Sequence, residues 1–305
     1  MSSPEPERAA DAPQPTRDPI ARGFAAALAA YLSWGALPIY YKALHWVPPF
    51  ELLAHRVVWS MVFLALLVTF QRRWRELGPA VSGRRLAPYL ASTIFLSANW
   101  LIFIWAVNSG RILEASLGYF INPLVNVLFG VTLLRERLTW RQGVAVVLAG
   151  LGVFALVVRA GVFPWVSIVL AFSFGSYGLV RKKAAMDAVV GLFIETALLT
   201  PLSLLYLVLL AARGQGSFGA SAATTALLTA AGAFTAVPLI WFALGVRSLR
   251  LSTMGLLQYI APTGQFLLAV GLYREPFTGA HAVAFGFIWA SLALYSWDAL
   301  RPRSP

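Results

Sequence analysis

Long apolar runs separated by short polar segments dominate the chain. Ten runs are present, at about 20–41, 49–70, 86–108, 113–134, 141–158, 163–180, 189–211, 222–245, 251–272 and 278–298. The hydrocarbon core of a bilayer is roughly 30 Å thick, and about 20 apolar helical residues cross it. The runs are continuous, whereas a membrane β-strand alternates in polarity. The pattern therefore predicts an all-α polytopic membrane protein with ten transmembrane helices.

Composition agrees with this prediction. Of the 305 residues, 59% are hydrophobic and 12% are charged, and mean hydropathy is +0.73. Soluble proteins carry about twice that share of charge. Residues 1–19 are rich in proline, mixed in charge and lack the apolar segment of a signal peptide. We expect 1–19 to be a disordered cytoplasmic tail and 299–305 to be a cytoplasmic C-terminal tail.

Positive charge lies in clusters between the apolar runs. The net charge of +12 would suit a nucleic-acid-binding protein, but these clusters stand where membrane proteins keep their lysines and arginines. With the N-terminus inside, 18 of the 24 Lys and Arg residues fall in cytoplasmic segments, 5 fall in outer segments, and Arg56 falls within a run. The bias predicts that both termini are cytoplasmic.

The chain also repeats itself. A shift of 139 residues aligns 103–139 with 242–278 at 13 identities in 37 positions, and a shift of 140 aligns LSWGALPIYYK (32–42) with FSFGSYGLVRK (172–182). Each half, 20–158 and 163–298, has five predicted spans, so the two copies must lie in opposite orientations. Inverted repeats of this kind build many secondary transporters. The sequence therefore predicts two inverted five-helix repeats.

A proline and two asparagines interrupt the fourth run, GYFINPLVNVLFG (118–130). Proline removes a helical hydrogen bond, and transporter sites are lined by such broken helices near the midplane. The ninth run has the same combination of a proline with amides and a tyrosine nearby. The candidates are Tyr119, Asn122 and Asn126 with a helix break at Pro123, and Gln258, Tyr259 and Gln265 with a break at Pro262. The alternative is a packing kink, with amides bonding neighbouring helices.

Three ionisable side chains lie inside the runs. His55 and Arg56 lie about six residues from the outer end of their run, and Glu195 lies about six from the inner end of its own, roughly 10 Å deep at 1.5 Å per residue. Charges at this depth mark functional sites. A direct pair between Arg56 and Glu195 would need tilted helices or a watery cavity. We expect Glu195 to carry a proton or to pair with a cationic group of the substrate, and the alternative for Arg56 is snorkelling to the headgroups.

Further residues complete the candidate substrate path. They are the aromatic residues Trp34, Trp105, Tyr177 and Trp241 and the amides Asn99 and Asn108. Tryptophans in membrane proteins are also typical of the interfacial belts, which is the alternative. Small residues at Ala282, Gly286 and Ala290 suit close helix packing or a homodimer face.

Enzyme signatures are missing from the sequence. It has no HExxH, GxSxG or P-loop motif, no cysteine, and only three scattered histidines. We expect neither an enzyme nor a metal site nor a cofactor.

Four strings carry a resemblance to a known family. LLAHRVVWS (52–60), NWLIFIWAVNSGRILEASLGYFINPLVNV (99–127), LAFSFGSYGLVRKK (170–183) and RLSTMGLLQYIAPT (250–263) resemble the RarD proteins, bacterial members of the EamA branch of the drug/metabolite transporter superfamily. The resemblance covers about 20–298 and implies an inner-membrane permease. The family usually has glycine before the glutamate that closes the fourth and ninth spans. Here Arg135 and Arg274 stand before Glu136 and Glu275, and we expect loop ion pairs at both places.

These observations predict a secondary transporter that moves a small organic metabolite or drug across the bacterial inner membrane without ATP. Alternating access between the repeats would be driven by a proton or another coupling ion. Two alternatives have the same fold: a membrane scaffold or sensor without flux, and a flippase for lipid-linked substrates.

Overall fold

The computed structural model describes residues 19–108, 112–160, 165–272 and 279–300. All of its regular elements in these ranges are helical. The long helices are α1 (Pro19–Lys42), α2 (Pro49–Phe70), α4 (Leu86–Asn108), α5 (Ile112–Leu133), α6 (Trp140–Ala160), α7 (Trp165–Lys183), α8 (Ala188–Ala212), α9 (Ala222–Ser248) and α12 (Gly279–Leu300). The shorter ones are η1 (Trp74–Glu76), α3 (Leu77–Val81), η2 (Gly83–Arg85), α10 (Leu251–Leu257), α11 (Ile260–Leu267) and the π-helical turn η3 (Leu268–Leu272).

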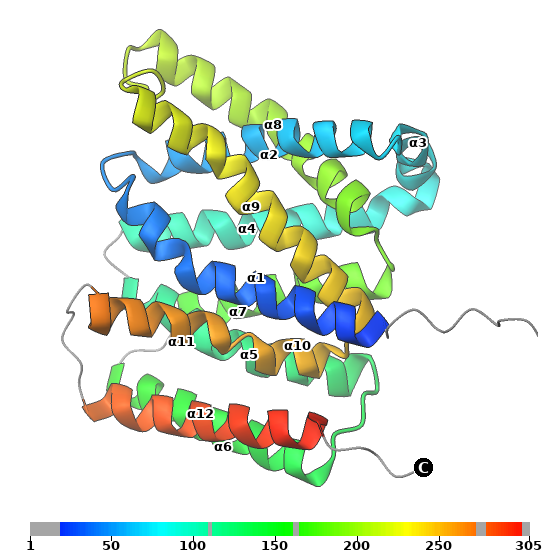
Figure 1. Cartoon of the computed structure of the whole chain (residues 1–305), viewed down its shortest axis with the longest axis vertical. Helices are drawn as coiled ribbons and strands as arrows, with labels where there is room; N and C mark the ends of the chain where they lie inside the picture. The colour runs from blue at the N-terminus through cyan, green and yellow to red at the C-terminus, as the bar shows by residue number, and fades with distance from the viewer. Residues whose placement is uncertain (1–18, 109–111, 161–164, 273–278, 301–305) are drawn as a thin grey trace, which may run out of the picture.

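The helices lie across the long axis of the molecule in successive layers (Figure 1). α6 packs against α12 at one end, α5 packs against α7 and α10, and α2 packs against α8 and α9 toward the other end. Further extensive pairings join α1 to α9 and to α11, and α4 to α7. α1 begins and α12 ends on the same side of the molecule, which is also the side of α3.

Lipid is the solvent that suits the outer surface. Large apolar side chains are exposed along the long helices, such as Leu202 at 71%, Val208 at 62% and Phe154 at 64%. In water such surface would be costly. Among the described residues, five helical segments are long and apolar enough to cross a membrane: Pro19–Lys42, Pro49–Phe70, Gly83–Phe103, Ala188–Ala212 and Ala222–Ser248. The prediction of an all-α polytopic membrane protein is confirmed.

The two predicted helix breaks have different outcomes. α5 runs without interruption through Pro123, so the break predicted there is wrong. The ninth run does divide, because α10 ends at Leu257 and α11 begins at Ile260. Pro262 has no N–H to donate to the carbonyl of Gln258 four residues earlier, and that carbonyl accepts from Ala261 at 3.1 Å instead. The run therefore divides just before Pro262.

Glu136 is a helix cap, and the loop ion pair expected for it is a minor contact. Its carboxylate accepts from the backbone N–H groups of Leu251 at 2.6 Å and Ser252 at 3.0 Å, in the first turn of α10. Arg250 lies 3.9 Å away, at the limit of an ion pair. Helix N-termini favour anions, which explains the acid at this position. Glu275 lies outside the described residues.

Arg135 has a left-handed backbone, with φ of 55°. The turn lets Glu136 N–H donate to the carbonyl of Gly130 and sends the glutamate side chain toward α10. A left-handed conformation costs an L-residue roughly 1–2 kcal/mol, and glycine adopts it freely. This explains why glycine suits the residue before the closing glutamate.

Candidate functional site

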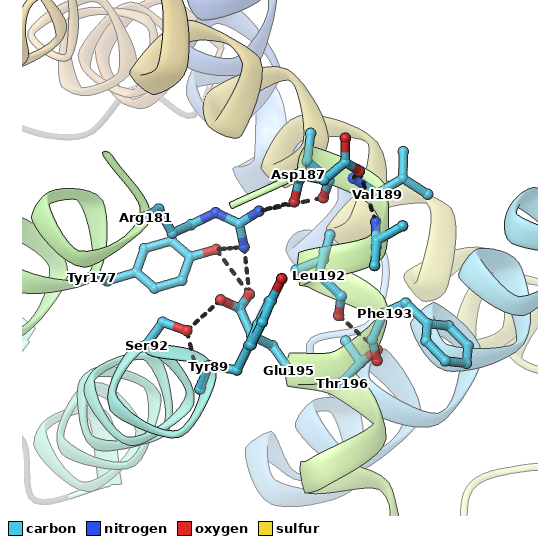
Figure 2. A network of polar contacts seen from close by, with 12 residues as sticks. Tyr89, Ser92, Tyr177, Arg181, Asp187, Val189, Leu192, Phe193, Glu195 and Thr196 are labelled. Carbon is cyan, nitrogen blue, oxygen red and sulfur yellow. Dashed lines mark hydrogen bonds and ion pairs between the residues drawn. The ribbon is translucent and has the colours of Figure 1, made fainter. Parts of the chain in front are cut away.

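A buried ion pair joins α7 to α8. Arg181 Nη1 lies 2.6 Å from Glu195 Oε2, and the two side chains are 1% and 0% exposed. Figure 2 shows Glu195 facing Arg181, Ser92 and Tyr177. Ser92 on α4 donates to Oε1 at 2.5 Å, and the Tyr177 hydroxyl donates to Oε2 at 3.3 Å. We call these four residues the inner cluster.

The turn between α7 and α8 positions Arg181. Asp187 caps α8, because its side chain accepts from the N–H groups of Val189 and Val190 at 2.9 and 3.0 Å. Arg181 Nη2 donates to the carbonyls of Asp187 at 3.0 Å and Ala188 at 3.4 Å. The guanidinium is therefore held by both the turn and the carboxylate.

Asp187 links this turn to two other segments of the chain. Its Oδ2 lies 3.0 Å from Arg73 and 3.3 Å from Arg247. Partial burial raises the pKa of Asp187, but the hydrogen bonds from Arg73 and from the α8 backbone outweigh it and leave the pKa below its usual value. The carboxylate is thus charged at neutral pH, as both the cap and the ion pairs require.

The partner of Glu195 differs from the sequence-based expectation. From the sequence we expected Glu195 to act together with His55 and Arg56 of the other half. We counted Arg181 among the cations of a cytoplasmic segment. Arg181 instead points inward and neutralises Glu195. Its spacing of four residues from Tyr177 puts both on one helix face, which was the available signal. Ser92 had no comparable signal.

A second polar cluster surrounds Arg56, where α1, α2 and α9 meet. Arg56 Nε donates to Thr235 Oγ1 at 2.9 Å, and Nη1 donates to the Tyr41 hydroxyl at 2.8 Å. The guanidinium also lies 5.4 Å from the ring centroid of Trp100 on α4. We call Arg56, Tyr41, Thr235 and Trp100 the outer cluster.

His55, the neighbour of Arg56, faces elsewhere. Its Nε2 lies 3.9 Å from Glu51, and its ring stacks on Phe218 at 5.2 Å. Glu51 in turn accepts from the backbone N–H and the hydroxyl of Ser217 at 2.5 and 2.9 Å. His55 therefore belongs to the contact between α2 and the α8–α9 connection.

The amides of the two repeats meet between α5 and α10. Asn126 donates to the side-chain oxygens of Gln258 at 2.9 Å and Asn122 at 3.1 Å. Asn122 donates to the carbonyl of Ala171 on α7 at 2.8 Å. All three amides are at least 95% buried, and these contacts match the packing alternative that the sequence left open.

Three more candidates also bond across helices. Gln265 donates to the carbonyl of Trp34 at 3.1 Å, and the Tyr259 hydroxyl donates to the carbonyl of Phe120 at 3.2 Å. Asn99 donates to the Leu170 carbonyl at 2.9 Å and to a serine hydroxyl on α7 at 3.0 Å. These side chains fix helix spacing around the two clusters.

The aromatic candidates separate into two groups. Trp34 packs edge-on against Tyr31 and Phe174, Tyr177 is fully buried, and Trp241 packs at the edge of the core.

Tyr119 and Trp105 are 40% exposed each, and Trp105 lies 5.3 Å from Trp165. The side chain of Asn108 lies outside the described residues. Ala282, Gly286 and Ala290 are exposed along α12, and a dimer there stays a prediction.

Within the ranges that the structure describes, no group of three His, Cys, Asp or Glu side chains is placed to hold a metal ion.

Comparison with known proteins decides the family. Residues 21–158 match the model of the EamA-like transporter family. An uncharacterized transporter of Vibrio cholerae is 45% identical over 289 residues, which cover 94% of this chain and 96% of that protein. The chain belongs to the EamA-like transporter family. Protein RarD of Escherichia coli is 44% identical over 281 residues, covering 92% of this chain and 95% of RarD.

A solved crystal structure shares the fold. It covers 92% of this chain at a TM-score of 0.71 and 21% identity, and this chain covers 99% of it. Family membership makes the chain a multi-pass membrane transporter of a bacterial family and not an enzyme. The bilayer and a solute are therefore its partners.

Proposed function

We propose that the chain is a secondary transporter for a small organic solute that works by alternating access between two inverted five-helix halves, 20–158 and 163–298. Helix packing supports the proposal. The repeat makes each helix of one half the counterpart of a helix in the other: α1 of α7, α2 of α8, α4 of α9, α5 of α10–α11 and α6 of α12. When counterparts are exchanged, the pairing of α1 with α9 becomes the pairing of α7 with α4, which the structure also contains. The pairing of α5 with α7 likewise becomes that of α10–α11 with α1.

Hydrogen bonds follow the same exchange at the level of helices, and this is the observation that carries the proposal. Gln265 aligns with Asn126 at a shift of 139 residues, and Asn122 lies one turn before Asn126 on α5. On the first side, the α5 amide Asn122 bonds a carbonyl of α7; on the second, the α11 amide Gln265 bonds a carbonyl of α1. Inverted halves with corresponding helix pairings can exchange conformations, so that each in turn opens its own side.

We further propose that the chain sits in the inner membrane with both termini in the cytoplasm. The bias of Lys and Arg toward alternate connections supports it, and so does the position of the α1 start and the α12 end on one side. The inner cluster then lies near the cytoplasmic face and the outer cluster near the opposite face.

Single cysteines in this cysteine-free chain test the orientation. An impermeant maleimide added to intact inner-membrane spheroplasts should label Ser217→Cys in the α8–α9 connection. Ser82→Cys, on the exposed turn before η2, is the matched control and should react only after permeabilisation. The reverse pattern of labelling would contradict the proposed orientation.

Flux through purified protein in vesicles tests the transport function. A mixture of small metabolites and drugs is loaded, and release is followed by mass spectrometry. We expect at least one solute to leave faster than from protein-free vesicles, without ATP. If no solute does so while a partner protein is stably retained, the scaffold interpretation is favoured instead.

A cross-link provides the matched control for flux. Glu51 and Ser217 touch at 2.9 Å between the two halves. In the doubly substituted Glu51→Cys and Ser217→Cys protein, a short bismaleimide would hold the halves together at this side. We expect release to stop after linking and to continue in the same protein before linking, because alternating access needs this contact to open.

A further inference from the structure

Arg56 is a membrane-embedded cation held by neutral groups. Its two hydrogen-bond partners, Thr235 and Tyr41, are hydroxyls, and its ring neighbour is Trp100. Among the described residues no carboxylate lies within ion-pair distance of Arg56. A charge inside a membrane protein normally has a partner, since desolvation costs several kcal/mol.

Glu51, the acid on the same helix, is already engaged. Both of its carboxylate oxygens accept hydrogen bonds from Ser217, and its ionisable neighbour is His55, with Nε2 at 3.9 Å. Arg56 uses Nε and Nη1 for its bonds to the two hydroxyls, Nη2 makes no hydrogen bond to the described residues, and the side chain is partly exposed. The Nη2 edge is therefore the part of the guanidinium that we assign to a ligand.

The inner cluster shows what the outer cluster lacks. At a shift of 139 residues Arg56 aligns with Glu195, and at a shift of 140 Tyr41 aligns with Arg181. In the second half a cation and a carboxylate face each other at 2.6 Å. In the first half the cation stands at the carboxylate's position and faces a phenol at 2.8 Å. The outer cluster thus has a net charge of one positive, whereas the opposite charges of Arg181 and Glu195 cancel in the inner cluster.

We propose that Arg56 binds the carboxylate of the transported solute, which is therefore a small organic anion. Thr235 and Tyr41 orient the guanidinium, and the open Nη2 edge donates to the ligand oxygen. The Trp100 indole, already beside the guanidinium, offers an aromatic face to an unsaturated or ring-bearing anion. The inference rests on the proposed transport function, because it takes the bound anion to be the solute.

Ligand-dependent thermal unfolding of the whole purified protein tests the binding. The protein is placed in phosphatidylcholine nanodiscs and titrated with benzoate, with benzamide as the neutral analogue of the same shape. We expect benzoate to raise the unfolding temperature with a saturable dependence, and benzamide to have at least about tenfold lower apparent affinity, since a charge-assisted hydrogen bond is lost. Equal responses to both would overturn the proposal.

Two substitutions at Thr235 isolate the charge. Thr235→Asp places a carboxylate beside Nε, as an internal competitor for the ligand. Thr235→Asn disturbs the same hydroxyl without adding charge. We expect the Asp variant to weaken benzoate binding at least tenfold more than the Asn variant does. Arg56→Gln gives an independent reading, and benzoate responses that persist in it would contradict the assignment.

The remaining arms separate the source of the anion and the function. If added phosphatidylglycerol raises the unfolding temperature and abolishes the benzoate response, the site binds lipid headgroups and the proposal falls. Benzoate binding without flux would leave the site standing and remove the transport function. Flux of neutral or cationic solutes without Arg56-dependent benzoate binding would support the transport function and contradict the proposed anion site.

Discussion

Replacing Glu195 by glutamine should lower the free energy of unfolding by about 3–5 kcal/mol, because it leaves Arg181 charged and unpaired in a fully buried place. Ser92 and Tyr177 donate to different oxygens of Glu195, and glutamine keeps only one acceptor oxygen, so the loss combines the unpaired charge with one altered hydrogen bond. Unfolding of the purified protein in mixed micelles by a denaturing detergent measures it.

An exposed ion pair supplies the matched control. Arg73 lies 2.6 Å from Glu76, the same distance as in the buried pair, but the Glu76 side chain is 49% exposed. Glu76→Gln should change stability far less than Glu195→Gln, since water solvates Arg73, which also keeps its ion pair with Asp187 at 3.0 Å. Equal losses at Glu76 and Glu195 would contradict the argument from burial.

Removing both charges together should restore much of the loss. The double substitution Arg181→Met and Glu195→Met eliminates the uncompensated charge, so we expect it to unfold closer to the wild type than either single variant. A double variant as unstable as the sum of the single ones would show that the two residues are not coupled.

The same double variant tests whether Glu195 carries a proton during transport. It lacks the titratable group but avoids the unpaired arginine. If its flux keeps the wild-type rate and pH profile, Glu195 serves packing alone. A lost pH dependence with retained flux would support the coupling role that the sequence suggested.

Gly232→Ala should destabilise the protein by about 1–3 kcal/mol or more, because α2 and α9 cross with their backbones in contact. An added Cβ would lie 2.3 Å from the carbonyl carbon of Trp59 and 2.8 Å from the backbone nitrogen of Ser60. Neither atom can move like a side chain. Ser60 also donates to the Gly232 carbonyl at 3.2 Å, a bond that the separation would break.

Gly150→Ala on α6 is the control for Gly232→Ala. No atom lies within 4 Å of a Cβ added there, so the exchange changes helix propensity alone and should leave stability equal or slightly higher. Thermal unfolding of both variants in the same nanodiscs makes the comparison. A Gly232→Ala protein that unfolds at the wild-type temperature would refute the close crossing.

Much of the architecture can be predicted from the sequence because the membrane constrains each segment locally. A span needs about 20 apolar residues and satisfied backbone groups, whatever it packs against. The predicted run 49–70 is α2, the run 86–108 is α4, and the run 222–245 lies within α9. The break before Pro262 accompanies a missing N–H, but Pro123 lacks the same N–H inside an unbroken α5, so proline alone does not decide where a run divides.

The partners of the buried polar and charged side chains could not be predicted in this way. Arg181 belonged to a cytoplasmic cluster by charge, and only the turn that Asp187 caps directs it inward to Glu195. Asn126 meets Gln258 across 132 residues of chain, and Glu136 reaches the start of α10 across 115. Such contacts depend on how helices cross.

By itself the sequence determined the apolar segments, their repeat, and which polar residues enter them. Only the tertiary structure decided that Glu195 is neutralised from within while Arg56 faces hydroxyls and an indole. The physical reason is one of range: hydropathy and proline act within a turn or a span, whereas the pairing of a buried charge depends on the few ångströms between helices that the chain order does not specify.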